Sequence, residues 1–480
     1  MFWNHTARKL GHAALLAALA VAPALAQHTH SEGAQEAKEK KVADPHAGHK
    51  MPEQEPKPNN QAHDHSAHTA GMNHSDNMNE AGMYLMNLAS GTSMNARSWP
   101  MPMLMPKLGS WNLMIMGQGF LVSTQQSGPR GADKIYAPNW GMVSAEHKLG
   151  KGSFMLQSMF SFDPATVTNR RYPLLFQTGE TAYGKPLVDA QHPHDFLMGV
   201  GVHYAHPLGE DTFIHGYYAP VGDPALGPVA FPHRASAFEL PQATLAHHLQ
   251  DSTHIANNVA TLAFKHRWLR LEASSFYGTE PNENRWNIDW GPMNSYSGRI
   301  SIFPTKNLMA QFSGGRLKDP EGHSLDAHRS AHGGDVVRTT ASLHYTRPTG
   351  DGNAWSTSLI WGRNHNTDSE RNTNSYLIET LYPLTRKDFL TARAEFVDKD
   401  ELFANDHEIE HHLAETAGST FRIQAYTVGY TRDIGTFKNV EAGVGANLSA
   451  YVVPSAIKPY YGDHPWGANI FLRFRLKPKN

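Results

Sequence analysis

Histidine and methionine are concentrated in a polar stretch close to the beginning of the chain. Imidazole nitrogen suits Cu(II), Zn(II) and Ni(II), whereas the thioether sulfur of methionine is a soft ligand that selects Cu(I). A segment that offers both could hold copper in either oxidation state. The residues that we predict to bind metal here are His46, His49, Met51, His63, His65, His68, Met72 and His74. The alternative is a hydrophilic linker in which the histidines are incidental.

A second group of histidines lies within two long polar connections further along the chain. Pro241 suits the first turn of a helix, because its missing N–H costs nothing there. On such a helix His247 and Asp251 are four residues apart, so their side chains share a face. The metal ligands predicted in this group are His192, His194, His247, His248, Asp251 and His254. The alternative is that these histidines form hydrogen bonds within loops or lie in solvent.

The composition excludes several classes of protein. The sequence contains no cysteine, so disulfides, thiolate zinc sites and iron–sulfur clusters are ruled out, and any metal must be held by His, Met, Asp or Glu. Its 42 Lys and Arg residues nearly balance its 44 Asp and Glu residues, so nothing favours nucleic acid as a partner. No segment after residue 26 is long and apolar enough for a membrane helix.

The chain divides into four segments by composition. Residues 1–26 have a basic start, an apolar run and the small-x-small pattern Ala24-Leu25-Ala26, which predicts a cleaved signal peptide. Residues 27–80 are polar and rich in histidine and methionine, and we expect them to be disordered because they cannot bury enough apolar surface. Residues 81–110 are a methionine-rich linker or plug segment. Residues 111–480 carry the pattern of a β-barrel.

That pattern is a series of short stretches in which apolar and polar residues alternate one by one. In residues 337–345, Val337, Leu343 and Tyr345 alternate with Arg338 and His344, and similar stretches begin near residues 111, 269, 390 and 468. A period of two predicts β-strands. The five tryptophans that we expect in an interfacial aromatic girdle are Trp111, Trp268, Trp355, Trp361 and Trp466.

The connections between these strands decide between a soluble sandwich and a membrane barrel. Tight turns are predicted at 148–152, 207–211, 267, 304–307, 347–353, 385–388 and 432–438. Longer connections are predicted at 123–138, 163–195, 220–256, 278–294, 316–335, 365–373, 398–420 and 451–465. Short and long connections alternate strictly, as in outer-membrane barrels. We therefore predict an all-β fold, an antiparallel transmembrane β-barrel of about 16 strands, after a disordered N-terminal leader.

Two parts of the chain resemble known groups of proteins. His46-Ala-Gly-His49-Lys-Met51 and His65-Ser-Ala-His68, with Met72 and His74, resemble the His/Met leaders of periplasmic and outer-membrane copper-resistance proteins. Residues 183–194 and 240–258 are similar to bacterial outer-membrane β-barrel proteins associated with heavy-metal efflux. The resemblance implies a Gram-negative outer-membrane protein in a metal-resistance setting.

Three hypotheses for function follow. The first is a barrel that binds or passes metal ions, copper foremost, with no required cofactor; its partners would be outer-membrane lipid, metal ions, a homotrimer or a metal-efflux system. The second is a general porin or solute channel with incidental histidines. The third is a barrel hydrolase, because Ser252 lies near His248 and His254, and Ser236 near His233. Chance pairing explains these serines equally well, and we do not expect an enzyme.

Overall fold

The chain was analysed as a computed structural model that describes residues 78–321 and 334–478. The predicted signal peptide and residues 27–77 of the predicted leader, with all eight of its candidate metal ligands, lie outside the described residues. Two short strands, β1 (Lys107–Leu108) and β3 (Asp133–Tyr136), pair only with β2. The sixteen strands of the barrel are β2 (Trp111–Gln126), β4 (Asn139–Leu149), β5 (Gly152–Phe160), β8 (Leu197–Gly209), β9 (Thr212–Gly222), β10 (Ala256–His266), β11 (Leu269–Tyr277), β12 (Ser295–Thr305), β13 (Leu308–Leu317), β14 (Val336–Pro348), β15 (Ala354–Asn366), β16 (Asn372–Pro383), β17 (Asp388–Lys399), β18 (Phe421–Phe437), β19 (Val440–Val452) and β20 (Trp466–Leu476).

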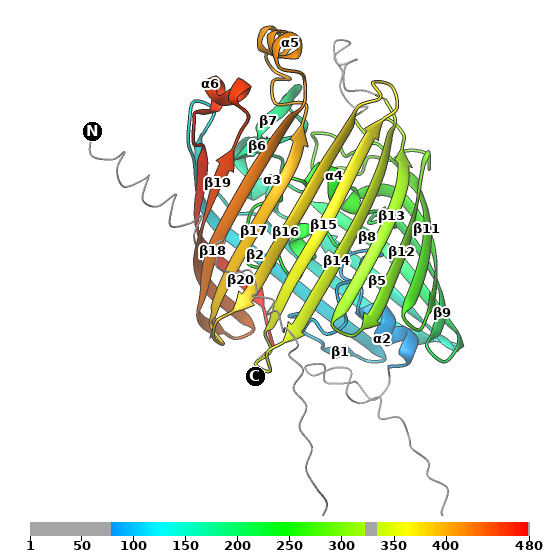
Figure 1. Cartoon of the computed structure of the whole chain (residues 1–480). Coiled ribbons are helices and arrows are strands. Elements are labelled where there is room, and N and C mark those ends of the chain that lie inside the picture. The colour runs from blue at the N-terminus through cyan, green and yellow to red at the C-terminus, as the bar shows by residue number, and fades with distance from the viewer. Residues whose placement is uncertain (1–77, 322–333, 479–480) are drawn as a thin grey trace, which may run out of the picture. The chain divides into compact units, whose positions relative to one another are not determined.

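Each barrel strand pairs antiparallel with the next, and the last strand pairs with the first (Figure 1). In the closing pair, Leu121 of β2 lies opposite Leu472 of β20. A closed sheet has no free edge, so every strand finds a backbone partner on both sides. The predicted fold class, a closed antiparallel barrel of about 16 strands, is confirmed.

The connections also follow the predicted order of short turns and long loops. Seven tight turns join alternate pairs of strands, and one of them is displaced from its prediction: β18 extends to Phe437, so its turn falls at residues 438–439. Strand pairing continues that far because Phe437 is in register with Val440. The long connections carry the hairpin of β6 (Tyr172–Ala182) and β7 (Lys185–Gln191), and the helices α3 (Asp163–Thr166), α4 (His247–Gln250), α5 (His407–Thr416) and α6 (Lys458–Tyr461).

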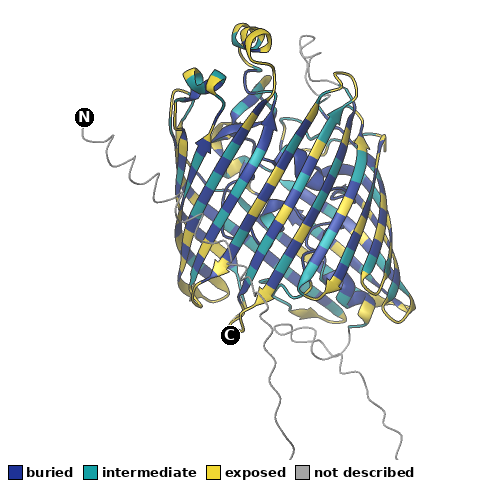
Figure 2. Ribbon diagram, viewed as in Figure 1, coloured by how far each residue is buried: buried dark blue, intermediate teal, exposed yellow. Residues whose placement is uncertain are grey.

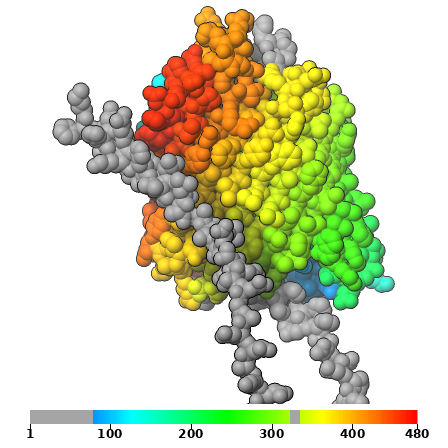
Figure 3. All heavy atoms as spheres, viewed as in Figure 1, coloured from blue at the N-terminus to red at the C-terminus, as the bar shows by residue number. Residues whose placement is uncertain are grey.

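Buried and exposed residues alternate along the strands (Figure 2). On β14, Arg338 and His344 are buried, whereas Val337 and Leu343 are exposed. Alternate side chains of a strand point to opposite faces, so one face of this sheet is the polar barrel interior and the other is its apolar exterior. On the outer wall, the green, yellow and orange strands lie against one another without a break (Figure 3). Exposed apolar side chains on the exterior include Leu121, Val143, Leu156, Leu262, Phe264, Ile300, Phe312, Leu359, Ile378, Ile470 and Leu472.

The predicted aromatic girdle is right in part. Trp111, Trp268, Trp355 and Trp466 lie at or beside a strand end, and none of them is buried. Trp361 lies in the middle of β15, so it does not fit a girdle at the membrane interface. Its position is outward-facing and suits lipid contact there instead. Among the described residues, no helix has the length and apolar character needed to cross a bilayer.

Two segments fill the barrel interior. Residues 223–255, which connect β9 to β10, are almost all buried, and α4 lies among them inside the barrel (Figure 1). Helix α2 (Glu80–Met86) and the residues after it pack against the inner faces of β4, β5 and β8 at the end that carries the tight turns. The interior is therefore a packed polar and apolar core rather than an open pore.

Candidate functional site

The segment 223–255, which we call the lumen loop, is anchored to the barrel wall by buried ion pairs. Arg234 Nε lies 2.5 Å from Glu379 Oε1 of β16, and Arg393 Nε of β17 lies 2.9 Å from Glu379 Oε2. Ser236 donates a hydrogen bond of 2.8 Å to the same carboxylate. Charges removed from water are stable only when they are paired in this way. These contacts fix the position of the loop inside the lumen.

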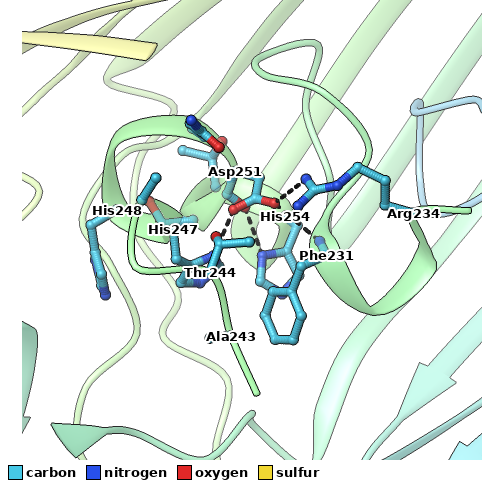
Figure 4. A network of polar contacts seen from close by, with 12 residues as sticks. Phe231, Arg234, Ala243, Thr244, His247, His248, Asp251 and His254 are labelled. Atoms are coloured by element: carbon cyan, nitrogen blue, oxygen red, sulfur yellow. Dashed lines mark hydrogen bonds and ion pairs between the residues drawn. The ribbon is translucent and has the colours of Figure 1, made fainter. Parts of the chain in front are cut away.

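Asp251 is the centre of the polar network in the lumen loop (Figure 4). Its carboxylate accepts hydrogen bonds from His247 Nδ1 at 2.7 Å, Arg234 Nη1 at 3.1 Å and the backbone N–H of Phe231 at 3.0 Å. Burial alone would raise the pKa of Asp251, but His247 and Arg234 lower it below its ordinary value. Asp251 is therefore ionised, and it fixes His247 with its proton on Nδ1.

Three imidazoles hold the same ring nitrogen, Nδ1, against an oxygen. His194 Nδ1 lies 2.9 Å from Asp163 Oδ2, and His254 Nδ1 donates to the backbone carbonyl of Asp251 at 2.8 Å. With His247 held by Asp251, each of these rings, when neutral, keeps the lone pair on Nε2. A histidine whose other ring N–H is held by an oxygen is the usual form of a metal ligand.

The spacing of these rings suits a shared ion, although their orientations do not yet converge. The ring centroids of His247 and His254 are 5.3 Å apart, and those of His194 and His254 are 5.7 Å apart. Two imidazoles on one tetrahedral ion have centroids about 5 Å apart, given metal–nitrogen distances of about 2.0 Å. Among residues 78–321 and 334–478, no three His, Asp or Glu side chains are arranged to hold an ion together. As they lie, these rings do not form a metal site.

His192 and His248 extend this cluster toward the long connections. Their ring centroids are 5.9 Å apart, and the ring centroids of His248 and His247 are 5.2 Å apart. His192 Nε2 is 3.0 Å from Glu180 Oε1, and His248 Nδ1 is 3.6 Å from Glu280 Oε2. His248 and Glu280 also line a cavity of about 100 Å³. We call His192, His194, His247, His248, His254 and Asp251 the imidazole cluster; the structure brings together all six residues that the sequence selected in this region.

The helix predicted from Pro241 is wrong in extent. Helix α4 has four residues, His247–Gln250, and residues 241–246 are irregular apart from a turn at 245–246. The preceding residues are held by the barrel wall instead of by a helix: Gln242 Nε2 donates to Asn447 of β19. The spacing of His247 and Asp251 nevertheless produces the predicted contact, because it needs a single helical turn.

Three carboxylates of the site were not selected from the sequence. Asp163 and Glu180 come from the connection that also carries His192 and His194, and Glu280 comes from the connection between β11 and β12. Each contacts a different histidine. Their positions in predicted outer connections were the only available signal. Of the remaining connection histidines, His407, His411 and His412 lie on the outer helix α5 and not in the cluster. His323, His328 and His332 lie outside the described residues.

The hydroxyls proposed for a hydrolase have other partners. Ser252 donates to Glu280 Oε1 at 3.1 Å and accepts from Arg338 Nη1 at 2.8 Å. Ser236 contacts Ser358 and Glu379. These contacts do not provide the serine–histidine pair that nucleophilic catalysis of this kind requires.

Comparisons with known proteins give distant likenesses. No family model matches the chain, and no curated protein matches it. Solved structures of similar fold include OmpF of Salmonella typhi in complex with daunomycin (9% identity, 78% of this chain and 100% of that chain, TM-score 0.45). The chain is similar to the same degree to the anion-selective porin from Comamonas acidovorans (12% identity, 76% of this chain and 100% of that chain, TM-score 0.44). The outer membrane channel DcaP of Acinetobacter baumannii gives 8% identity over 77% of this chain and 99% of that chain, with a TM-score of 0.44. The fold assignment depends on the strand pairing and not on these likenesses.

Burial makes the lumen loop sensitive to acid. Burial lowers the pKa of His247 to about 4, against the opposing effect of Asp251, and lowers the pKa of His233 to about 3. Both rings are therefore neutral at pH 7 while the loop is packed. A histidine in an opened loop has an ordinary pKa of about 6.5, so the opened loop binds more protons below that pH.

We therefore expect acid to release the lumen loop. Each such ring favours opening by up to about 1.4 kcal/mol per pH unit, from about pH 6.5 down to its own lowered pKa. Single-channel conductance of the full chain should rise between pH 7 and pH 5. His233→Gln should reduce this rise because it removes one proton site, whereas His411→Gln, on the exposed α5, should not. Equal conductance at both pH values would contradict the expectation.

Proposed function

We propose that this protein is a Gram-negative outer-membrane barrel that binds metal ions, copper foremost, and passes them through a filled lumen. The single observation that carries the proposal is the imidazole cluster. Five histidines from two separate long connections meet in the barrel, and four of them, His192, His194, His247 and His254, hold their Nδ1 atoms against oxygen acceptors. Imidazole is a preferred ligand of Cu(II), Zn(II) and Ni(II).

The apolar exterior supports the membrane location in this proposal. Large apolar side chains such as Leu262, Phe312 and Ile470 are exposed on the outside, at 58%, 54% and 66%. Water disfavours so much exposed apolar surface, whereas the hydrocarbon of a bilayer does not. A closed barrel also leaves no unpaired strand edge in lipid.

The packed interior favours ions over general solutes. Inward-facing Glu379 and Arg473 have no exposed surface, because the lumen loop covers them and pairs with them. A general porin of this size keeps an aqueous lumen. The alternative, a solute channel, is favoured by one feature: a cavity of about 640 Å³, lined by Pro100, Gly350, Lys477 and their neighbours, lies at the end that carries the tight turns.

The test is Cu(II) binding by the full chain in detergent micelles. We expect His194→Gln, His247→Gln and His254→Gln, combined in one variant, to lose one Cu(II) per chain and the matching nitrogen hyperfine signal in electron paramagnetic resonance. The matched control is His206→Gln, which replaces a histidine of β8 that lies outside the cluster. The natural chain, the triple variant and the control all keep the predicted leader. Any ions bound there therefore contribute equally to the three measurements.

Binding must also be linked to a role in cells. Cells that carry the triple variant should tolerate less copper than cells that carry the control. Unchanged copper stoichiometry, or unchanged tolerance to copper, zinc and nickel, would contradict the proposal. High conductance to sugars or small anions that metal does not affect would favour the solute channel.

A further inference from the structure

Methionines form a continuous row on the inner wall of the barrel. Met116 of β2 lies directly opposite Met142 of β4, and Met142 lies directly opposite Met159 of β5. Their exposed fractions are 2%, 0% and 3%. Directly opposed residues on neighbouring strands have Cβ atoms about 5 Å apart. Because methionine is unbranched and flexible, the two flanking thioethers can turn toward the central one.

Helix α2 and the segment between it and β1 bring further methionines to this row. Met86, Met94 and Met103 are buried in the same cluster as the three wall residues. Met114, Met155 and Met198 also belong to it, from the inner sides of β2, β5 and β8. We call the row Met116, Met142 and Met159, with these neighbours, the methionine wall. It therefore consists of thioethers from four strands and from the segment that packs on them.

Several polar atoms beside the methionine wall have no partner. Ser144 Oγ, Gln157 Nε2 and Gln118 Oε1 are buried and make no hydrogen bond. Ser144 and Gln157 lie opposite each other on β4 and β5, two residues from Met142 and Met159. One row further, His203 of β8 lies opposite Met155 of β5. The Nε2 atom of His203 is also without a partner, while its Nδ1 atom lies 3.1 Å from Nε2 of His215. Buried polar atoms without partners cost free energy unless a bound water or ion contacts them.

Packing alone explains part of this arrangement, because methionine fills irregular gaps well. It does not explain why unpartnered polar atoms border the same residues. Leucine or isoleucine could fill the space equally well if the wall served only to pack the segment against it. Thioether sulfur, in contrast, combines apolar packing with affinity for soft cations.

We propose that the methionine wall binds a soft monovalent cation, Cu(I) or its analogue Ag(I), through the thioether sulfurs of Met116, Met142 and Met159. The site is separate from the imidazole cluster, which offers nitrogen ligands for divalent ions. In β4 and β5 its residues lie toward the strand ends that are away from the turn at residues 150–151. The two sites share no residue, so either proposal can fail without the other.

The test is Ag(I) binding by the full chain in detergent micelles, in chloride-free buffer, followed by metal analysis. The variant carries Met116→Leu, Met142→Leu and Met159→Leu, which keep volume and apolar character and are among the best tolerated substitutions in a packed core. We expect it to bind one Ag(I) fewer per chain, while Cu(II) binding at the imidazole cluster is unchanged. The control is Met293→Leu, at a methionine that is 39% exposed.

A second measurement identifies the ligand atoms. X-ray absorption of the protein loaded anaerobically with Cu(I) should show sulfur neighbours, and the triple variant should lose part of that signal. If the triple variant does not fold, as judged by its migration on unheated gels, Met142→Leu alone should weaken Ag(I) binding at least tenfold. Equal Ag(I) stoichiometry and affinity in the folded variants and the natural chain would overturn the proposal and leave packing as the role of the wall.

Discussion

Replacing the lumen loop with a two-residue turn is expected to raise the conductance of the barrel by about tenfold or more, because a sixteen-strand barrel without internal segments encloses an aqueous channel. The replacement is feasible since Gly222 of β9 pairs directly with Ala256 of β10. An Asn-Gly turn can therefore join the two strands after residues 223–255 are removed. Planar-bilayer recordings of the purified variant measure the change.

The charges that the loop now covers do not prevent this variant from folding. Glu379 and Arg393 pair with each other at 2.9 Å in the absence of Arg234. Arg473 and Arg475 lose Glu239 but keep Asp433 and Glu441 as partners. In an open lumen all of them would be hydrated, so their desolvation cost disappears together with the contacts.

The matched control removes a segment that does not enter the lumen. Helix α5 lies in the connection between β17 and β18 and stands at the outer end of the barrel (Figure 1). Its replacement by a short turn should leave conductance at the level of the natural chain. If the lumen-loop variant folds and conducts no better than this control, the segment that includes α2 closes the barrel instead, and the prediction is wrong.

The barrel could be predicted from the sequence because its rules are local and repeat along the chain. Alternation of Val337 and Leu343 with Arg338 and His344 is a period-two pattern that any membrane barrel imposes. The order of short and long connections then gave the strand number and the direction of each strand. The misplaced turn at residues 432–438 shows the limit of this reasoning. A turn was predicted there, but pairing with β19 extends the strand to Phe437.

The candidate site was predicted less completely, because its contacts join residues that are far apart in the sequence. His247 and Asp251 could be paired from their spacing alone, as one helical turn is enough. The contacts of His194 with Asp163 and of His192 with Glu180 depend on how the connection between β5 and β8 folds back on itself. No local pattern records that folding, and for the same reason the predicted helix from Pro241 was too long.

Methionines at inward-facing positions of the strands were a sequence signal for the methionine wall, but they stood among polar residues of the same alternating set and were not singled out. Met114 and Met116 occupy the same alternating set as Asn112, which is the inward set of β2. Methionine on an interior face is an exception to the polar interior expected of such barrels. The cross-strand register that aligns Met116, Met142 and Met159 could not be obtained without the lengths of the turns and the bulges.

The second large effect is expected from a single carboxylate that holds the lumen loop to the wall. Glu379 has no exposed surface, and it pairs with Arg234 of the loop and with Arg393 of β17. Glu379→Gln keeps the shape of the side chain but leaves two buried guanidinium groups with less neutralising charge. We expect the free energy of unfolding to fall by about 3–5 kcal/mol, as is found when one partner of a buried ion pair is removed.

Denaturant unfolding in micelles, followed by tryptophan fluorescence, measures this loss of stability. The control is Asp351→Asn, which breaks the exposed pair of Asp351 and Arg386, where the side chains are 36% and 77% exposed. Exposed pairs contribute at most about 1 kcal/mol, since water and salt screen them. If Glu379→Gln lowers the free energy of unfolding clearly more than Asp351→Asn does, the lumen loop and the barrel wall unfold as one cooperative unit. Similar small losses for both variants would mean that the loop is packed in the lumen without depending on Glu379.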